Sequence, residues 1–218
     1  PYSILFRGCG LLLTYQTGVA VALQDLSPDI LKCASKIYGA SSGSIIATLL
    51  LCECDLGKGC TIPPLLGAVG KGCTIPPLLG NALETLKETL NKYLPPNAHQ
   101  MVSGRLHIII TRLRDCRSVA ISEFTSKEDI IQAVICSCFV PPFVGLLPPV
   151  YRGMRYVDGE IGMWRSNFVS RTTITISGFA GEYDICPKDV SAAFFTMKIS
   201  DWILHISKRN IFRLMCIL

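Results

Sequence analysis

The sequence has few charged residues, and its basic residues are not gathered into clusters. Only 17% of the 218 residues are Asp, Glu, Lys or Arg, and the net charge is +5. A nucleic-acid-binding protein needs a concentrated basic patch, so we expect no nucleic-acid partner. The small positive charge instead slightly favours contact with an anionic lipid surface.

A long uninterrupted apolar run is also missing, although 50% of the residues are hydrophobic. The nearest candidate for a membrane-spanning helix is 130–150, which is interrupted by Pro141, Pro142, Pro148 and Pro149. A helix that crosses a bilayer needs about 20 apolar residues, and proline breaks helical hydrogen bonding. We therefore expect one globular domain, for which 218 residues are enough.

The eleven cysteines follow no recognisable pattern. Their number is odd, and none of them has the C-x-x-C spacing of a zinc site. The pairs Cys52/Cys54 and Cys136/Cys138 fall on expected helices, and the sequence has neither an Asn-x-Ser/Thr site nor a signal peptide at its start. We therefore expect reduced thiols in the cytoplasm, with no metal and no cofactor.

One segment of eleven residues occurs twice. Residues 57–67 recur unchanged at 70–80, and their paired prolines and many glycines argue against helix. A solenoid needs about three or more repeats, so one tandem copy indicates an irregular insertion over 57–80. A recent duplication and a faulty gene model both explain it, and its apolar tip could touch a lipid surface.

Residues 39–43 read Gly-Ala-Ser-Ser-Gly and match the Gly-x-Ser-x-Gly pattern of a nucleophile elbow. In this turn a strand passes sharply into a helix and exposes one serine hydroxyl at the bend. The flanks fit, because 36–38 are typical of a short strand and 44–51 of a buried helix. Ser41 is the candidate nucleophile, with Gly39 and Gly43 as the elbow glycines. A tight structural turn is the alternative.

Asp158 is the candidate base for Ser41. Residues 155–159 read Arg-Tyr-Val-Asp-Gly, so a strand ends at a carboxylate, where active-site groups commonly lie. The alternative is an Asp that caps its own turn. His205 completes the Ser–Asp–His order of α/β-hydrolases, but it lies in an apolar stretch, and only one strand–helix unit precedes the serine. Asp158 is therefore the better base.

A glycine turn follows the first expected strand, residues 3–6. Residues 8–10 read Gly-Cys-Gly, and the apolar run 11–26 continues as a helix. Backbone N–H groups at such a turn bind anions, and in acyl transfer that anion is the tetrahedral oxyanion. Gly8, Cys9 and Gly10 are therefore the candidate oxyanion hole. A dinucleotide site does not fit, because Leu13 replaces the third glycine of Gly-x-Gly-x-x-Gly.

The remaining patterns alternate strand and helix. Strands are expected at 106–113, 118–123 and 172–177. Helices are expected at 82–93 and from Asp129 to about 139, with Ser126 as the N-cap paired to Asp129. This order predicts a three-layer α/β/α domain with a mainly parallel sheet and Ser41 and Asp158 at strand ends. The apolar run 139–147 is typical either of core packing or of a loop that lines an acyl site.

The glycine turn, the serine elbow and the late Asp-Gly, in this order, resemble the patatin-like phospholipase family. The similarity is greatest to its adiponutrin-like animal branch and covers nearly the whole chain. The matching stretches are 8–10, 39–43, 137–141, 145–149, 156–159 and 184–187. The resemblance implies one patatin-like domain over 1–218, truncated at both ends.

The resemblance also implies a Ser–Asp dyad without histidine. Ser41 would attack the acyl carbonyl of a lipid ester, and Asp158 would act as general base and then as general acid. Water as acceptor would give lipase or phospholipase action, and a lipid hydroxyl would give transacylation. The implied location is cytoplasmic, peripheral to lipid droplets or membranes, with a possible activator protein.

Two departures from the family pattern favour a second hypothesis, a catalytically inactive homologue at the lipid-droplet surface. The family has Asp-Gly-Gly or Asp-Gly-Ala, whereas Glu160 follows Gly159 in this sequence. The family continues with Asn and Pro, whereas this chain has Met-Trp-Arg-Ser at 163–166. The Glu160 carboxylate would either raise the pKa of Asp158 or point to solvent.

Overall fold

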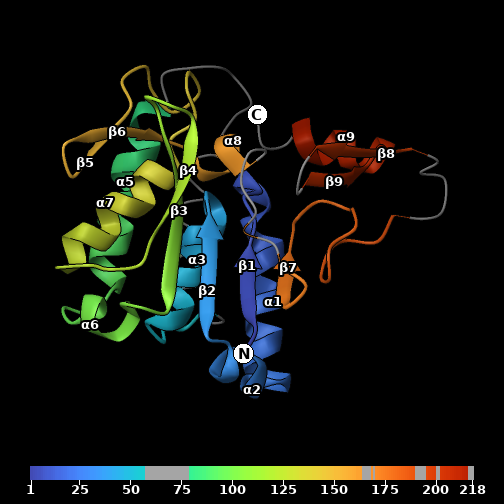
Figure 1. Cartoon of the computed structure of the whole chain (residues 1–218), viewed down its shortest axis with the longest axis horizontal. Helices are drawn as coiled ribbons and strands as arrows, with labels where there is room; N and C mark the ends of the chain where they lie inside the picture. Colours follow the sequence, from blue (N-terminus) through green and yellow to red (C-terminus); the bar gives the residue numbers. More distant parts are fainter. Residues whose placement is uncertain (57–78, 164–167, 169, 190–194, 200–201, 216–218) are drawn as a thin grey trace.

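The computed structural model describes residues 1–218 except 57–78, 164–167, 169, 190–194, 200–201 and 216–218. A seven-stranded sheet forms its centre, with the strand order β5-β6-β3-β2-β1-β7 and with β4 paired to β3 (Figure 1). The strands are β1 (Ser3–Phe6), β2 (Lys36–Ala40), β3 (Leu106–Arg112), β4 (Arg117–Ile121), β5 (Val150–Tyr151), β6 (Met154–Val157) and β7 (Thr173–Ile176).

The central strands are parallel. β1 runs parallel to β2 and β7, and β2 runs parallel to β3, whereas β4 and β6 are antiparallel to β3. The α/β class with a mainly parallel sheet is therefore confirmed. Because β1 and β2 pair with Phe6 opposite Gly39, the turns that follow these two strands meet at one edge of the sheet.

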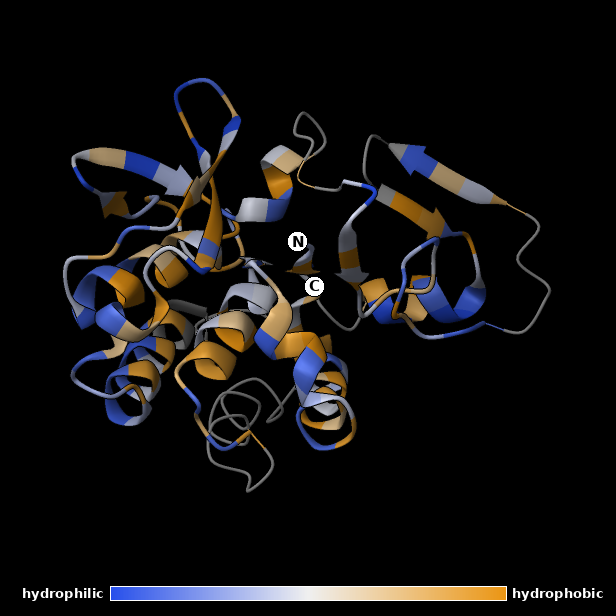
Figure 2. Ribbon diagram, turned by 60° about the horizontal axis from the view of Figure 1, so that its bottom comes forward, coloured by the Kyte–Doolittle hydropathy of each residue, from blue (hydrophilic) through white to orange (hydrophobic). Residues whose placement is uncertain are grey.

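The chain connects these strands through helices, as parallel strands require. The helical segments are η1 (Gly10–Leu12), α1 (Leu13–Leu26), α2 (Pro28–Cys33), α3 (Ser42–Leu51), α5 (Leu79–Tyr93), α6 (Ala98–Val102), α7 (Lys127–Ser137) and α8 (Gly159–Met163). Several of them alternate hydrophobic and hydrophilic stretches along the ribbon (Figure 2). None of the helices in the described part of the chain is long and apolar enough to cross a membrane.

Two hydrophobic clusters lie on opposite faces of the sheet. Ile4 and Phe6 of β1 belong to the larger cluster, which also takes in buried residues of α1, α3, α5, α6 and α7. Leu5, between them, belongs to the smaller cluster with Ala40, Ile109 and the α8 residue Met163. Successive side chains of a strand point to opposite faces, so the main helical layer and α8 cover different sides of the sheet.

A small unit lies beyond β7, formed by the hairpin β8 (Thr196–Ile199) and β9 (Trp202–His205) and by helix α9 (Lys208–Met215) (Figure 1). Buried Asn210 joins it to the preceding loop. Its amide donates to the carbonyl oxygens of Ala180 and His205 at 2.6 and 2.8 Å and accepts from the Ala180 N–H at 2.9 Å.

The predicted elements agree with the observed ones except at their ends. The run 11–26 begins as the 3₁₀ turn η1 and becomes α-helical only at Leu13. Helix α3 ends at Leu51, so the prediction that Cys52 and Cys54 lie on a helix is wrong. The repeat segment lies outside the described residues over 57–78, and its last two residues are the first two residues of α5.

Candidate active site

The sharp strand-to-helix turn expected around Ser41 is present. β2 ends at Ala40 and α3 begins at Ser42, and Ser41 between them has φ +52° and ψ −129°. A positive φ is strained for serine, and such strain gathers at functional sites. The first N–H groups of α3 have no intrahelical partners, so the helix presents a positive end close to this serine.

Both elbow glycines are required by close backbone contacts. A Cβ atom on Gly43 would lie 2.2 Å from the Phe6 carbonyl oxygen, and one on Gly39 would lie 2.5 Å from the Cα of Ser44. Any larger residue would push α3 away from β1 or β2. The expectation that Gly43 lets helix and strand pack closely is therefore confirmed.

Ser137, at the end of α7, holds the Ser41 turn in place through two hydrogen bonds. Its hydroxyl accepts the Ser41 N–H at 2.9 Å and donates to the carbonyl oxygen of Ile109 on β3 at 2.7 Å. The side chain is fully buried, so it bridges two backbone groups that would otherwise lie unsatisfied. Ser137 had no predicted role, although a polar residue at the end of an apolar helix was a usable signal.

Asp158 follows β6 and has two different carboxylate oxygens. Oδ1 accepts the N–H of Glu160 at 2.8 Å and so caps the first turn of α8. Oδ2 is buried and makes no hydrogen bond of ordinary geometry within the described part of the chain. The capping role is therefore real for one oxygen, and the other oxygen remains available to a hydroxyl or a substrate.

The sheet register explains why Asp158 lies near Ser41. Ala40 is opposite Ile109 on β3, and a Cβ atom on Gly159 would lie 2.1 Å from the Ile109 carbonyl oxygen. The Asp158 N–H also donates to the Phe139 carbonyl at 2.7 Å. These backbone contacts hold the Asp-Gly turn against the strand next to the elbow.

Burial raises the pKa of Asp158 from its ordinary value of 3.8 to about 7. The Asp158 side chain is only 2% exposed, and desolvation is the largest cause. The Ser41 hydroxyl and the Glu160 N–H lower this pKa, and the charge of Glu160 raises it. A carboxyl group with a pKa near neutrality can exchange a proton at physiological pH, as a general base requires.

The raised pKa predicts that Asp158 lowers stability as the pH rises. Its pKa is higher in the folded protein than in the unfolded chain, so the folded state binds the extra proton between about pH 4 and 7. Stability should fall across this range at roughly 1.4 kcal/mol per pH unit from this group. Urea unfolding at pH 4 and pH 8 measures this effect. Relative to wild type, the free energy of unfolding of Asp158→Asn should be a few kcal/mol higher at pH 8 than at pH 4. An equal difference at both pH values would contradict the raised pKa.

The glycine turn lies beside the elbow, but two of its N–H groups already have partners. A Cβ atom on Gly8 would lie 2.8 Å from the Ser41 Cβ, which places Gly8 against the candidate nucleophile. The Gly8 N–H donates to Glu160 Oε1 at 2.6 Å, and the buried Cys9 N–H donates to the Ser42 hydroxyl at 3.0 Å. Gly10 begins η1 with φ +51°, a conformation that favours glycine.

Glu160 is at the centre of this arrangement. Its side chain is 11% exposed and forms an ion pair with the buried Arg7, with Nη2 3.0 Å from Oε2. The alternative in which Glu160 points to solvent is therefore wrong, and its charge does raise the pKa of Asp158. The contact of Glu160 with Gly8 joins residues 152 positions apart and has no signal in the sequence.

His205 does not lie near Ser41 and Asp158. Strand β9, which carries His205, lies beyond β7 and away from α3 (Figure 1). The structure thus brings Ser41, Asp158 and Gly8 together and gives the Cys9 N–H a buried partner. The cysteines that it describes are all free.

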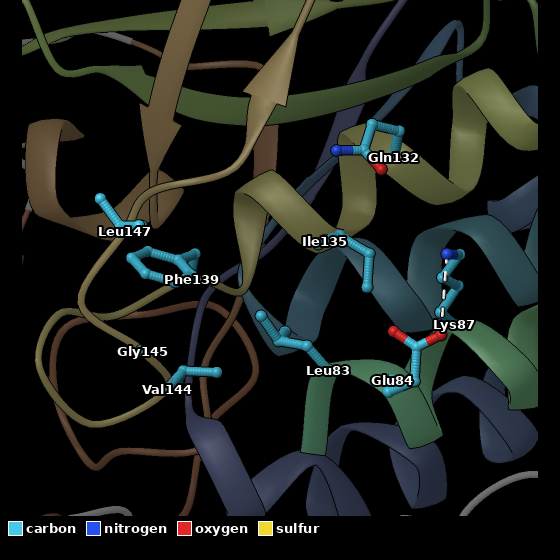
Figure 3. Close-up of a pocket in the computed structure, with 9 residues that line it drawn as sticks. All are labelled: Leu83, Glu84, Lys87, Gln132, Ile135, Phe139, Val144, Gly145 and Leu147. Carbon is cyan, nitrogen blue, oxygen red and sulfur yellow. Dashed lines mark ion pairs between the residues drawn. The ribbon is translucent and has the colours of Figure 1, made fainter. Parts of the chain in front are cut away.

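A groove is lined by α5, α7 and the loop that follows α7 (Figure 3). Its volume is about 330 Å³, and its lining residues are Leu83, Glu84, Lys87, Gln132, Ile135, Phe139, Val144, Gly145 and Leu147. Phe139 is buried, as the core-packing interpretation of the run 139–147 predicts. Leu146 and Leu147 are 82% and 79% exposed, so core packing is wrong for these two leucines. The Phe139 carbonyl connects this loop to Asp158.

Curated proteins similar to the chain cover nearly all of it. Human "Omega-hydroxyceramide transacylase" is 39% identical over 98% of the chain and 41% of its own length. Mouse "1-acylglycerol-3-phosphate O-acyltransferase Pnpla3" is 38% identical over 96% of the chain and 51% of its own length. "Patatin-like phospholipase domain-containing protein 2" of Rattus norvegicus is 40% identical over 98% of the chain and 45% of its own length. The chain thus spans about half the length of these relatives or less.

Family models and one solved structure give no closer match. No family model matches the chain. One solved structure, VipD from Legionella pneumophila, aligns with 83% of the chain and 50% of its own chain, at 15% identity and a TM-score of 0.47. This similarity is too low to support an argument about the fold or the site.

Proposed function

Because the chain belongs to the patatin-like phospholipase domain family, we propose that it is a serine lipid acyl hydrolase or transacylase that uses Ser41 and Asp158. One observation carries the proposal. A serine with φ +52° at a helix N-terminus lies close to a buried carboxyl whose pKa is about 7 and whose Oδ2 has no ordinary hydrogen bond in the described structure.

In the first half of the reaction, Ser41 Oγ bonds to the carbonyl carbon of a lipid ester while Asp158 takes its proton. Negative charge develops on the carbonyl oxygen. The N-terminal N–H groups of α3 would stabilise it, and the Gly8 N–H would do so once it is free of Glu160. The ester bond to the alcohol then breaks, and Asp158 returns the proton to the departing alkoxide. The acyl group remains on Ser41.

In the second half, an acceptor hydroxyl replaces the lost alcohol. Asp158 takes the proton of the acceptor, the acceptor oxygen bonds to the acyl carbon, and the bond to Ser41 breaks with return of the proton to its Oγ. Water yields a free fatty acid, as in a triacylglycerol lipase or a phospholipase. A lipid alcohol such as an ω-hydroxyceramide yields a new ester.

The loop between α7 and β5 is the proposed contact with the lipid. Leu146 and Leu147 in this loop are largely exposed, and Leu147 lines the groove of Figure 3. Adjacent exposed leucines gain free energy when they enter an apolar phase, about 1.5 to 3 kcal/mol for each side chain that is fully buried. We propose a peripheral position on lipid droplets or cytoplasmic membrane surfaces.

Replacing both leucines with serine should weaken binding to triacylglycerol emulsions by at least about tenfold, because most of this apolar contact is lost. Cleavage of a short soluble ester should be unchanged. Leu26→Ser is a matched control, since Leu26 is 82% exposed at the opposite end of the molecule, where α1 meets α2 (Figure 1). Equal emulsion binding by wild type and the double variant in a flotation assay would contradict the proposed contact.

A catalytically inactive lipid-surface homologue is the second candidate function. It is favoured by one observation, the Glu160 carboxylate bonded to the N–H of Gly8, where the oxyanion would bind. If the protein is such a homologue, the Ser41→Ala variant should bind lipid surfaces as well as wild type does.

Product analysis decides between these candidates. Wild-type protein and Ser41→Ala would be incubated with triacylglycerol or phospholipid as acyl donor, with and without an ω-hydroxyceramide, and the products separated by mass spectrometry. Fatty acid or acylceramide formed by wild type alone would support the enzyme, and the ratio of the two would identify the preferred acceptor. A folded wild-type protein that forms neither product would favour the inactive homologue.

A further inference from the structure

The Glu160 carboxylate is held at both oxygens by groups beside the candidate nucleophile. Oε1 accepts the Gly8 N–H at 2.6 Å, and Oε2 lies 3.0 Å from Arg7 Nη2. Arg7 is 3% exposed, and the Tyr183 ring lies 5.5 Å from its guanidinium carbon. The carboxylate is therefore fixed in a largely buried position and does not sample solvent freely.

The side chain of Glu160 and the hydroxyl-bearing carbon of Ser41 meet on the same side of Gly8. A Cβ atom on Gly8 would lie 2.5 Å from the Glu160 Cγ and 2.8 Å from the Ser41 Cβ. Glu160 reaches this point because Asp158 Oδ1 caps its N–H and fixes the first turn of α8. One carboxylate thus caps the turn, and the next carboxylate enters the position beside Ser41.

A carboxylate and a tetrahedral oxyanion are competitors for this position. Both carry negative charge and both accept backbone N–H groups, and an N–H engaged at 2.6 Å has no second full-strength hydrogen bond to give. An oxyanion that formed there would also be repelled by the carboxylate.

We propose that Glu160 occupies the oxyanion-binding position beside Ser41 and holds the site in a self-inhibited state. The inference rests on the proposed function, because it assigns the Gly8 N–H to an oxyanion on the Ser41 adduct. Activity then requires the Glu160 side chain to leave Gly8, after which the N–H can bind the substrate oxygen.

The test compares wild type with Glu160→Gln and Glu160→Ala by their rates of reaction with a fluorophosphonate probe. The alanine variant frees the Gly8 N–H and should react about tenfold faster or more, since one oxyanion donor changes such rates by about 10² to 10³. The glutamine variant keeps the shape of the side chain and loses its charge, so its labelling rate should lie between the rates of wild type and Glu160→Ala. Glu128→Ala is the matched control, because Glu128 is the exposed second residue of α7, as Glu160 is the second residue of α8.

The Gly8 amide resonance gives a readout that does not depend on activity. A short hydrogen bond to a carboxylate shifts an amide proton downfield, so this resonance should move upfield in Glu160→Ala and stay in place in Glu128→Ala. Equal labelling of wild type and Glu160→Ala, or slower labelling of the variant, would overturn the self-inhibited state and leave Ser41 as nucleophile. Absence of labelling from all of these proteins would overturn the proposed function, and the self-inhibition with it.

Discussion

Ser41→Ala is expected to abolish fluorophosphonate labelling and to lower lipid ester cleavage by about 10³-fold or more. The covalent route disappears with the hydroxyl, and no other described serine combines a positive φ with a buried carboxyl at its side. The measurement is the labelling rate and the turnover of a long-chain ester, with the same protein concentration and emulsion for both proteins.

Ser42→Ala is the informative control for this prediction. Ser42 is the next residue, but its hydroxyl accepts the buried Cys9 N–H at 3.0 Å and so has a structural role. Its loss should cost about 1 to 3 kcal/mol of stability and leave Ser41 able to react with the probe. Labelling that survived Ser41→Ala and vanished in Ser42→Ala would assign the wrong serine to the chemistry.

The second large effect is expected for Asp158→Asn. The asparagine carbonyl can still cap the Glu160 N–H, but its amide group cannot take the Ser41 proton. General acid–base catalysis contributes about 10²- to 10⁴-fold, and a loss in this range is expected in both labelling and turnover. Asp25→Asn makes the same chemical change on the exposed face of α1 and should retain full activity.

Stability separates this loss from damage to the fold. The variant replaces a buried carboxyl by a neutral isostere, so at pH 8 it should unfold at higher urea concentration than wild type. An inactive variant that is also less stable at pH 8 would indicate a structural role for Asp158. A stable variant with full activity would remove Asp158 from the reaction.

The sequence was informative where a local pattern dictates the backbone. The elbow could be predicted because Gly39 and Gly43 mark the two places where a side chain would strike a neighbouring backbone group. The strands could be predicted because buried parallel strands contain apolar runs, such as the three isoleucines 108–110 of β3. Helix ends were less accurate, since capping depends on a few contacts and not on the apolar pattern.

Contacts between distant segments could not be predicted in the same way. Ser137 reaches the Ser41 N–H across 96 residues, and only the packing of α7 beneath the elbow brings the two together. From the sequence alone, Glu160 had two alternative positions, and neither included its hydrogen bond to Gly8. Capping and catalysis by Asp158 were alternatives at the level of sequence, whereas in the structure the two oxygens of this carboxylate have different surroundings.

The most direct test of the account is the pH dependence of fluorophosphonate modification, mapped to the modified residue by peptide mass spectrometry. If Asp158 activates Ser41, an adduct forms on Ser41 at a rate that rises with pH through a midpoint near 7, as Asp158 loses its proton, and Asp158→Asn shows no such rise. An adduct on another residue, or a Ser41 adduct that forms at the same rate from pH 5 to pH 9, would contradict activation of Ser41 by Asp158.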